Sequence, residues 1–484
     1  MIPHAPLLAI IIPIISSVAL YVFGRRVEKY AGWLATIAAS LSVFMILSMV
    51  TDLIERGSIH FTYAWIRTPS LKLTFGFWVD MISFPIGLIV AVVSALSCFY
   101  SIKYMKGKSG QRGYYANLLL FMAGMIGVIL SANLLQFYLF WELMLVPSYF
   151  LIAFWGTSKK RLAIGFKYFI FTHFGSLCML LGILSIYVFT GTFDLAALPL
   201  AAINIPPSSI LPVFVLLLIG FCVKMALFPV HTWLPDAHAE APAPISAMLS
   251  GAMIKCGAYA IARILLSGFG QTMVQTSDVL MALGVITMIY GGLLALAQTD
   301  IKRLLAYSSI SQMGYIFFGL ATWLPDATLG ATGGLFHVIN HAICKALLFM
   351  CAGAIIHQTG TRNIKKLGGL AGKMPITCIA SLIGALSLAG IPPLNGFWSE
   401  WMIFSGGISS GKIFITTIAV FSTVITLGYY LWFVWRVFFG TTPKELENTK
   451  EASWLLYIPI VVLSAIAFVL GIWPDIILRL IALG

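Results

Sequence analysis

Residues 216–235 read LLLIGFCVKMALFPVHTWLP, and this stretch decides the fold class. Its apolar residues are typical of a membrane-spanning helix, which needs about 20 of them. The run also contains Lys224, and it is interrupted between Phe228 and Pro235 by two prolines. Inside lipid, a charge beside a helix break is tolerated only where it faces other protein segments or water. The stretch therefore predicts one helix within a bundle of membrane helices.

The rest of the chain has the same apolar character. Of its 484 residues, 60% are hydrophobic and 9% are charged, and the mean hydropathy is +0.99, whereas a soluble protein carries roughly 25% charged residues. This composition excludes a water-soluble globule. Runs long enough to span lie at about 5–23, 32–50, 75–100, 114–131, 134–155, 165–190, 210–230, 244–266, 278–298, 304–323, 330–357, 375–404, 412–438 and 453–481. We therefore predict an all-α integral membrane protein with about 14 transmembrane helices.

The net charge of +13 is distributed unevenly between the two sides of these runs. Loops that follow odd-numbered runs contain nineteen Lys and Arg residues, and the segments on the other side contain five. The positive-inside rule then places the odd-to-even loops in the cytoplasm. We predict a multi-pass protein of the plasma membrane with both termini outside. Basic loops account for the charge, so nucleic acid is not an expected partner.

Five charged residues lie deep inside apolar runs: Glu142, Lys224, Lys255, Lys345 and Glu400. A charge in the middle of a membrane costs at least about 2.5 to 3.5 kcal/mol, so such residues face the bundle interior and find partners. We expect Glu142 to pair with a buried lysine, preferably Lys224, because a nearby ammonium keeps a buried carboxylate ionised. Such a pairing can act as a switch for proton transfer. The alternative is a static ion pair that only holds helices together.

Histidines add further titratable groups. His337 and His341 precede Lys345 at intervals of four residues, so the three form one row on a helix face, over roughly 12 Å. Because histidine titrates near neutrality, this row suits a proton relay. His173 is alone in its run, where a structural role is as reasonable as a functional one.

A second helix is interrupted at residues 390–396, just before Glu400. The two breaks are five helices apart, and paired interruptions in matching positions indicate an inverted repeat with the ion site at the break. We therefore predict broken helices 7 and 12 within two inverted five-helix repeats. The predicted divisions are 1–113 (helices 1–3), 114–266 (helices 4–8), 278–438 (helices 9–13) and 453–484 (helix 14).

The sequence does not indicate a bound cofactor or metal. All seven cysteines lie in apolar runs, and none belongs to a C-x-x-C motif. His337 and His341 share one helix side, whereas an axial haem pair needs nitrogens on opposite faces of the ring. An independent redox enzyme is therefore a poor interpretation.

Four motifs carry a resemblance to a known family over nearly the whole chain. They are FWELMLVPSYFLIAFWG at 140–156, KMALFPVHTWLPDAHAEAPAP at 224–244, TDIKRLLAYSSISQMGY at 299–315 and AGIPPLNGFWSEWMIF at 389–404. The chain resembles the antiporter-like membrane subunits shared by respiratory complex I, its F420H2 dehydrogenase and membrane-bound hydrogenase relatives, and multisubunit Na⁺/H⁺ antiporters.

This resemblance implies a function and a setting. It implies a proton path through Glu142, Lys224, Lys255 and Glu400, with His231 nearby, in a subunit that holds no cofactor and does not itself catalyse redox chemistry. The implied partners are other antiporter-like and small membrane subunits, the lipid bilayer, and a redox arm with flavin, F420 or hydrogenase and iron–sulfur subunits. Such complexes belong to respiratory electron transport, with a quinone or another acceptor.

Within the family, the chain resembles complex I subunit M, the NADH-quinone oxidoreductase chain 4 type, because residue 400 is glutamate and not lysine. Gln312 and Lys345 are more typical of L-type, hydrogenase and antiporter chains, so an F420H2 dehydrogenase or a hydrogenase complex fits as well. We predict a proton-translocating subunit in which His231, His337, His341 and Lys345 support the relay. The alternatives are a subunit of a Na⁺/H⁺ antiporter and an assembly scaffold without its own transport.

Overall fold

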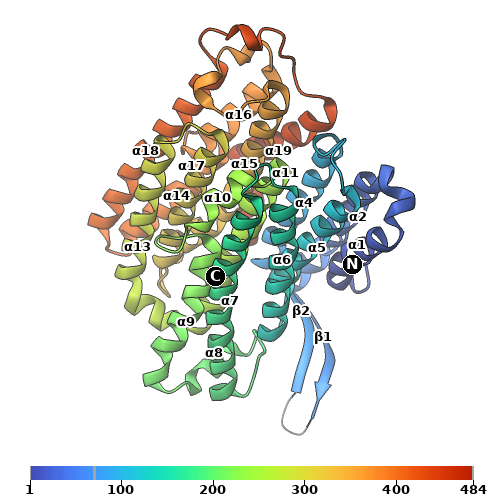
Figure 1. Cartoon of the computed structure of the whole chain (residues 1–484). Helices are drawn as coiled ribbons and strands as arrows, with labels where there is room; N and C mark the ends of the chain where they lie inside the picture. Colours follow the sequence, from blue (N-terminus) through green and yellow to red (C-terminus); the bar gives the residue numbers. More distant parts are fainter. Residues whose placement is uncertain (1, 69–71, 482–484) are drawn as a thin grey trace.

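The computed structural model describes residues 2–68 and 72–481 of the chain. Long helices run side by side in one bundle, and a two-stranded hairpin projects from one end (Figure 1). Among the described residues, 13 helices are long and apolar enough to cross a membrane. The twelfth predicted span supplies a further crossing in two shorter pieces. The predicted all-helical class with about 14 helices is thereby confirmed.

The helices follow the predicted order along the chain. The first spans are α1 (Ala5–Val27), α2 (Ala31–Leu47) with its short extension α3 (Val50–Arg56), and α4 (Ser83–Tyr104). Then come α5 (Gln111–Leu130), α6 (Leu134–Trp155), α7 (Arg161–Thr190), the short α8 (Leu198–Ala201), α9 (Pro207–Met225) and α10 (Trp233–Glu240). The eighth span combines α11 (Ala243–Met248) and α12 (Ile254–Ala260) with π-helical turns at Leu249–Met253 and Ile261–Leu266. The remainder are α13 (Gly270–Leu296), α14 (Ile301–Ala321), α15 (Leu329–Thr359), α16 (Pro375–Leu388), α17 (Asn395–Ser409), α18 (Ile413–Phe438), α19 (Trp454–Ile472) and α20 (Asp475–Ile481).

Both predicted helix breaks are present. α9 ends at Met225, and α10 starts only at Trp233. α16 ends at Leu388, and α17 starts at Asn395. Proline lacks a backbone donor and cannot continue a helix, which explains the interruptions at these two positions. The division into repeats at residues 113, 266 and 438 stays a prediction.

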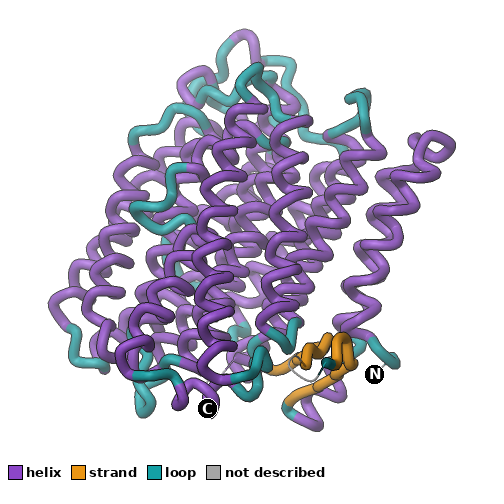
Figure 2. Tube along the Cα trace, turned by 60° about the horizontal axis from the view of Figure 1, so that its bottom comes forward, coloured by secondary structure: helices purple, strands orange, loops and turns teal. Residues whose placement is uncertain are grey.

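The hairpin is the one departure from the predicted helices. Residues from about 75 onward were expected to begin the third span, but β2 (Lys72–Asp80) pairs antiparallel with β1 (Ser58–Arg67), and α4 begins at Ser83. The segment LTFGFWV is rich in aromatic and β-branched residues, which favour a strand. Figure 2 shows the hairpin beside the N-terminal end of α1, where His4 Nδ1 lies 2.5 Å from the Tyr63 hydroxyl.

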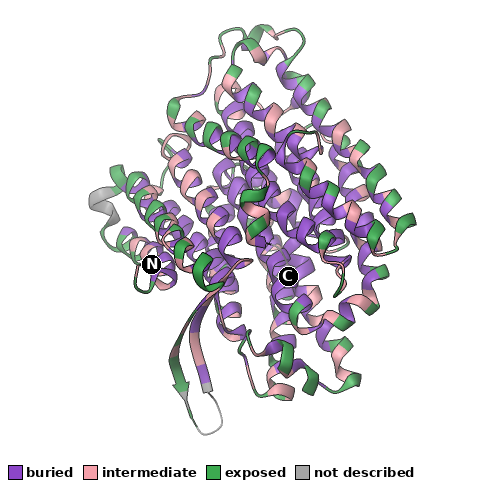
Figure 3. Cartoon of the chain, turned by 180° about the vertical axis from the view of Figure 1, so that it is seen from behind, coloured by how far each residue is buried: buried purple, intermediate pink, exposed green. Residues whose placement is uncertain are grey.

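The most buried helices form the centre of the bundle. The residues of α14 and α15 are almost all buried, as is the whole eighth span. By contrast, only about a third of the residues in the spanning parts of α1, α2 and α18 are buried, as expected for lipid-facing helices. Figure 3 shows the buried residues gathered in the interior and the exposed ones along the outer helices. The central helices also carry four of the eight predicted site residues, Lys255, His337, His341 and Lys345.

Close backbone contact joins α15 and α17, where Gly406 packs on Gly330. A Cβ added at Gly406 would overlap the backbone of Gly330. Small residues let membrane helices approach each other in this way. We expect Gly406→Val to separate the two helices and to lower the free energy of unfolding by about 1 to 3 kcal/mol. Thermal unfolding of the detergent-solubilised full chain measures the change.

Gly372 provides the matched control for this substitution. It is exposed, and a Cβ added there meets nothing within 4 Å. Gly372→Val is expected to leave the melting temperature unchanged. Equal melting temperatures for the Gly406 variant and the parent would contradict the packing account.

Candidate functional site

The predicted site residues lie on separate elements in the bundle interior. Glu142 comes from α6, Lys224 from α9, His231 from the break before α10, Lys255 from α12, His337, His341 and Lys345 from α15, and Glu400 from α17. Lys255, His337, His341 and Lys345 are all 0% exposed. The bundle therefore removes four ionisable side chains completely from the surface.

Lys255 and His341 form the centre of this arrangement. The Lys255 ammonium hydrogen-bonds to His341 Nδ1 and donates to the Ser250 carbonyl at 2.6 Å. Ser250 lies in the π-helical turn just before Lys255. His341 Nε2 is buried and has no partner among the described residues. One ring nitrogen of His341 therefore hydrogen-bonds with Lys255, and the other is available to a further partner.

The row on α15 continues from His341 to His337, as predicted. The two imidazole centroids are 6.2 Å apart. His337 Nδ1 lies 2.9 Å from Ser399 Oγ, and His337 Nε2 lies 2.7 Å from Gln312 Oε1. Polar groups from three helices thus follow one another from Lys255 toward α17.

Glu400 lies next to the end of this row, one residue after Ser399. Its carboxylate rests against Gly390 in the break of the twelfth helix, where a Cβ would overlap Oε2. Glu400 is 4% exposed, and its Oε1 has no partner among the described residues. A buried carboxylate at the end of a polar row is suited to accept a proton.

Lys345 points to a different partner from the two histidines. Its ammonium donates to the Leu305 carbonyl at 3.1 Å and to Ser308 Oγ, both on α14. It also lies 5.4 Å from the ring centroid of Tyr430. Lys345 shares the helix face of His337 and His341, but its charge is held by α14.

The expected ion pair between Glu142 and Lys224 is not formed. The Lys224 ammonium lies 5.1 Å from the Trp141 ring centroid and has no hydrogen-bond partner among the described residues. Glu142 Oε2 instead lies 3.2 Å from His173 Nδ1 on α7. Glu142 lies at the edge of the bundle with 22% of its side chain exposed. The Lys224 ammonium packs over the ring of Trp141, the residue directly before Glu142.

The structure places two further histidines, His173 and His238, where the sequence alone did not indicate a role. His173 is the observed partner of Glu142. His238 on α10 is 0% exposed, packs its ring 4.8 Å from that of Phe349, and has no described partner on either nitrogen. A signal for His238 was present in the motif at 224–244, where it follows His231 by seven residues. His231 itself packs against Phe228 and Tyr290, at 5.8 and 4.8 Å between centroids.

Ion pairs and hydrogen bonds fix α10 to the helices around it. Asp236 lies 2.8 Å from Lys167 Nζ on α7 and also pairs with Arg303 on α14. Lys302 donates to the carbonyl of Ala241, directly after α10. α10, which carries His238, is therefore held by α7 from the first half of the sequence and by α14 from the second half.

Comparison with known proteins assigns this arrangement to a family. The family model described as "NADH:quinone oxidoreductase/Mrp antiporter, TM" matches residues 131–426, well over half of the chain. The chain belongs to this family. A second model, "NADH-Ubiquinone oxidoreductase (complex I), chain 5 N-terminus", matches residues 65–115 of this antiporter-like subunit.

Individual relatives resemble the antiporter-like subunit over nearly its whole length. It is 33% identical to F(420)H(2) dehydrogenase subunit M of Methanosarcina mazei, covering 98% of this chain and 96% of that one. It is 35% identical to one subunit of the Na(+)/H(+) antiporter of Alkalihalophilus pseudofirmus over 97% of this chain. The antiporter-like subunit spans 60% of the length of that second relative.

Solved structures share the fold of this antiporter-like subunit. A chain of the membrane-bound sulfane sulfur reductase, described as an archaeal respiratory membrane complex, gives a TM-score of 0.88 at 30% identity, covering 98% of this chain and 77% of that one. A chain of the Mrp complex from Dietzia sp. DQ12-45-1b gives 0.88 at 24% identity, covering 99% and 96%. The second likeness concerns the fold alone.

The contact between Lys255 and His341 generates a direct test. His341→Ala removes the side-chain partner of Lys255 and interrupts the polar row between α12 and α17. We expect ion flux through the assembled complex to fall about a hundredfold or more, because a positioned acid–base group contributes on this scale. Quenching of a pH-sensitive dye in sealed vesicles measures the flux.

His357 on the same helix is the matched control. It is exposed near the C-terminal end of α15 and lies outside the polar row. His357→Ala is expected to leave the flux at the parent level. Parent-level flux in the His341 variant would show that the row is not used.

Proposed function

We propose that this subunit translocates protons through a buried Glu/Lys/His relay as part of a multisubunit, redox-driven membrane complex. The observation that carries the proposal is the polar row from Lys255 through His341 and His337 to Ser399, next to Glu400. The ionisable groups of the row are buried, and they come from the three helices α12, α15 and α17. Buried ionisable residues inside a membrane bundle are expensive, and proton relays are one of their main uses.

In this proposal the relay has an input side and an output side. Glu142 with His173 at the bundle edge senses a neighbouring subunit, and Lys224 is loaded with a proton from the cytoplasm. Lys255 and the α15 row carry the proton laterally, and Glu400 releases it. Because Lys224 has no hydrogen-bond partner among the described residues, its protonation responds to a charge that approaches Glu142.

The relatives and the loop charges support the setting that we propose. One relative is a subunit of F(420)H(2) dehydrogenase, and one fold match belongs to a respiratory membrane complex. We place this subunit in a complex of that kind, beside other antiporter-like and small membrane subunits and a redox arm. The excess of Lys and Arg in the odd-to-even loops supports an orientation with both termini outside the plasma membrane.

Na⁺/H⁺ antiport is the second candidate function. It is favoured by the 35% identity to the Na(+)/H(+) antiporter protein of Alkalihalophilus pseudofirmus, which extends over 97% of this chain. A carboxylate such as Glu400 serves either ion. The two candidates differ in whether sodium changes the proton flux.

Lys224→Ala and Glu142→Gln test the proposed relay in the complete complex. Each variant removes a charge that the relay needs, so we expect proton pumping to be lost while the complex still assembles. Pumping is measured in sealed vesicles with and without sodium, and assembly is measured by native electrophoresis. A sodium-dependent proton flux in the parent would favour antiport.

A lysine outside the interior provides the control, and two outcomes would contradict the proposed relay. Lys366 is exposed in a loop, so Lys366→Ala removes a lysine without touching the interior and should pump normally. Retained pumping in both relay variants would refute the relay. Loss of the assembled complex in both would instead favour the scaffold function.

A further inference from the structure

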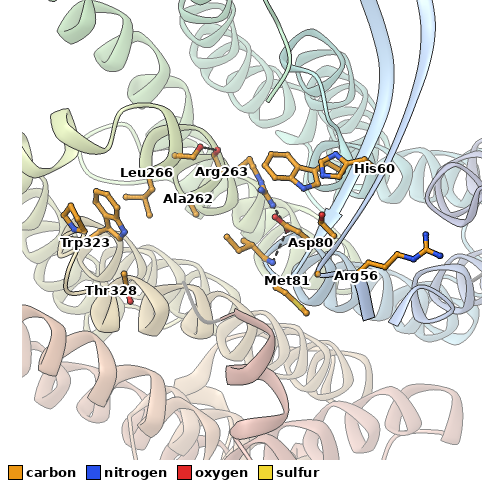
Figure 4. Close-up of a pocket in the computed structure, with 15 residues that line it drawn as sticks. Arg56, His60, Asp80, Met81, Ala262, Arg263, Leu266, Trp323 and Thr328 are labelled. Atoms are coloured by element: carbon orange, nitrogen blue, oxygen red, sulfur yellow. Dashed lines mark hydrogen bonds and ion pairs between the residues drawn. The ribbon is translucent and has the colours of Figure 1, made fainter. Parts of the chain in front are cut away.

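A cavity of about 590 Å³ lies at the hairpin end of the bundle, and none of the relay residues lines it. Its fifteen lining residues come from the end of α3, both strands of the hairpin, the turn from β2 into α4, the end of the eighth span and the loop between α14 and α15. Figure 4 shows Arg263 and Asp80 between Trp323 on one side and Arg56 on the other. The cavity is therefore a separate site with its own charged groups.

Arg263 is the central basic group of this cavity. Although it lies near the end of its helix, it is only 5% exposed. Its Nη2 lies 2.6 Å from Asp80 Oδ1, and its Nε donates to the Tyr259 hydroxyl at 3.0 Å. Its guanidinium also packs 4.2 Å from the Trp78 ring centroid. These two hydrogen bonds use Nη2 and Nε, so they leave the donors of Nη1 unused.

The guanidinium donors around the cavity suit an anion. Asp80 is the only acidic residue among the fifteen lining residues, and it faces Arg263. Burial alone would raise the pKa of the Asp80 carboxyl, but the charge and hydrogen bond of Arg263 outweigh it, so the pKa lies below its ordinary value. Asp80 is thus ionised and balances one arginine. Arg56 at the rim is paired with Asp52 at 3.9 Å, but its side chain is 71% exposed, so it presents further guanidinium donors at the mouth of the cavity.

The walls of the cavity fit a ligand that also has an apolar part. Trp78 and Trp323 line it together with Met81, Leu266 and Pro325. Leu266 is the last residue of the eighth span, and Trp323 follows α14 by two residues, so the cavity lies level with the helix ends. Tryptophan is enriched at this level, where lipid headgroups meet the hydrocarbon.

We propose that this cavity binds a phosphate-bearing anion, the phosphodiester headgroup of an anionic phospholipid such as phosphatidylglycerol. Arg263 Nη1 and the Arg56 guanidinium donate hydrogen bonds to the phosphate oxygens, because arginine presents planar paired donors that match phosphate. Trp78 and Trp323 pack against the glycerol part. The site is independent of the proposed relay.

Binding is tested on the full chain purified in detergent. Native mass spectrometry and thermal unfolding are recorded with short-chain phosphatidylglycerol, with phosphatidylcholine, and with inorganic phosphate. We expect phosphatidylglycerol to bind more tightly than phosphatidylcholine, and Arg56→Gln to weaken its binding about tenfold, as for the loss of a charged hydrogen bond. Arg263→Gln should abolish binding, and it is interpreted together with its melting temperature because Arg263 also holds the hairpin.

Arg479→Gln is the matched control for the rim variant. Arg479 is likewise an exposed arginine paired with an aspartate four residues before it, and it does not line the cavity. The Arg479→Gln variant should bind phosphatidylglycerol as tightly as the parent protein does. If inorganic phosphate binds as tightly as phosphatidylglycerol, the ligand of Arg56 and Arg263 is the free anion and not the lipid. Equal binding of both lipids, or an Arg56 variant with parent affinity, would overturn the proposal.

Discussion

The high free energy of a charge in a membrane interior governs this structure. A lysine or glutamate there must be met by polar groups that the fold itself supplies, since lipid supplies none. Lys255 and Lys345 meet this requirement in the same way, each with a backbone carbonyl and one side-chain partner. Lys224 does not, because its ammonium has no hydrogen-bond partner among the described residues and lies over the ring of Trp141. The three lysines therefore differ in how firmly their charge is held.

The π-helical turn before Lys255 shows how the backbone adapts to this requirement. An α-helix uses each carbonyl for the amide four residues later, whereas a π-helical turn shifts the pairing by one residue. In this structure the Ser250 carbonyl within the turn accepts a hydrogen bond from the Lys255 ammonium. The local geometry thus brings a backbone acceptor to the buried charge. Such turns are frequent at functional sites, and this one directly precedes the lysine at the centre of the polar row.

The sequence was sufficient for features that depend on composition or on a single helix. Apolar runs predicted the spans, prolines predicted both breaks, and spacing alone placed His337 and His341 on one face. It was not sufficient for contacts between helices. The partner of Glu142 turned out to be His173, whose selection depends on how α6 and α7 rotate against each other. The hairpin was missed because its aromatic residues are as apolar as a membrane helix, so hydropathy could not separate the two.

The helix breaks also explain why two of the deep charges are tolerated unequally. A helix carries a partial negative charge at its C-terminus and a partial positive charge at its N-terminus, and the effect fades beyond one turn. The first break places Lys224 in the last turn of α9, which ends at Met225, where the partial negative charge of the helix end favours a positive charge. The second break starts α17 at Asn395, which leaves Glu400 five residues further along, beyond the first turn. The dipole therefore favours a charged Lys224 more than a charged Glu400. This placement is compatible with the proposed role of Glu400 as a carboxylate that takes protons up and releases them.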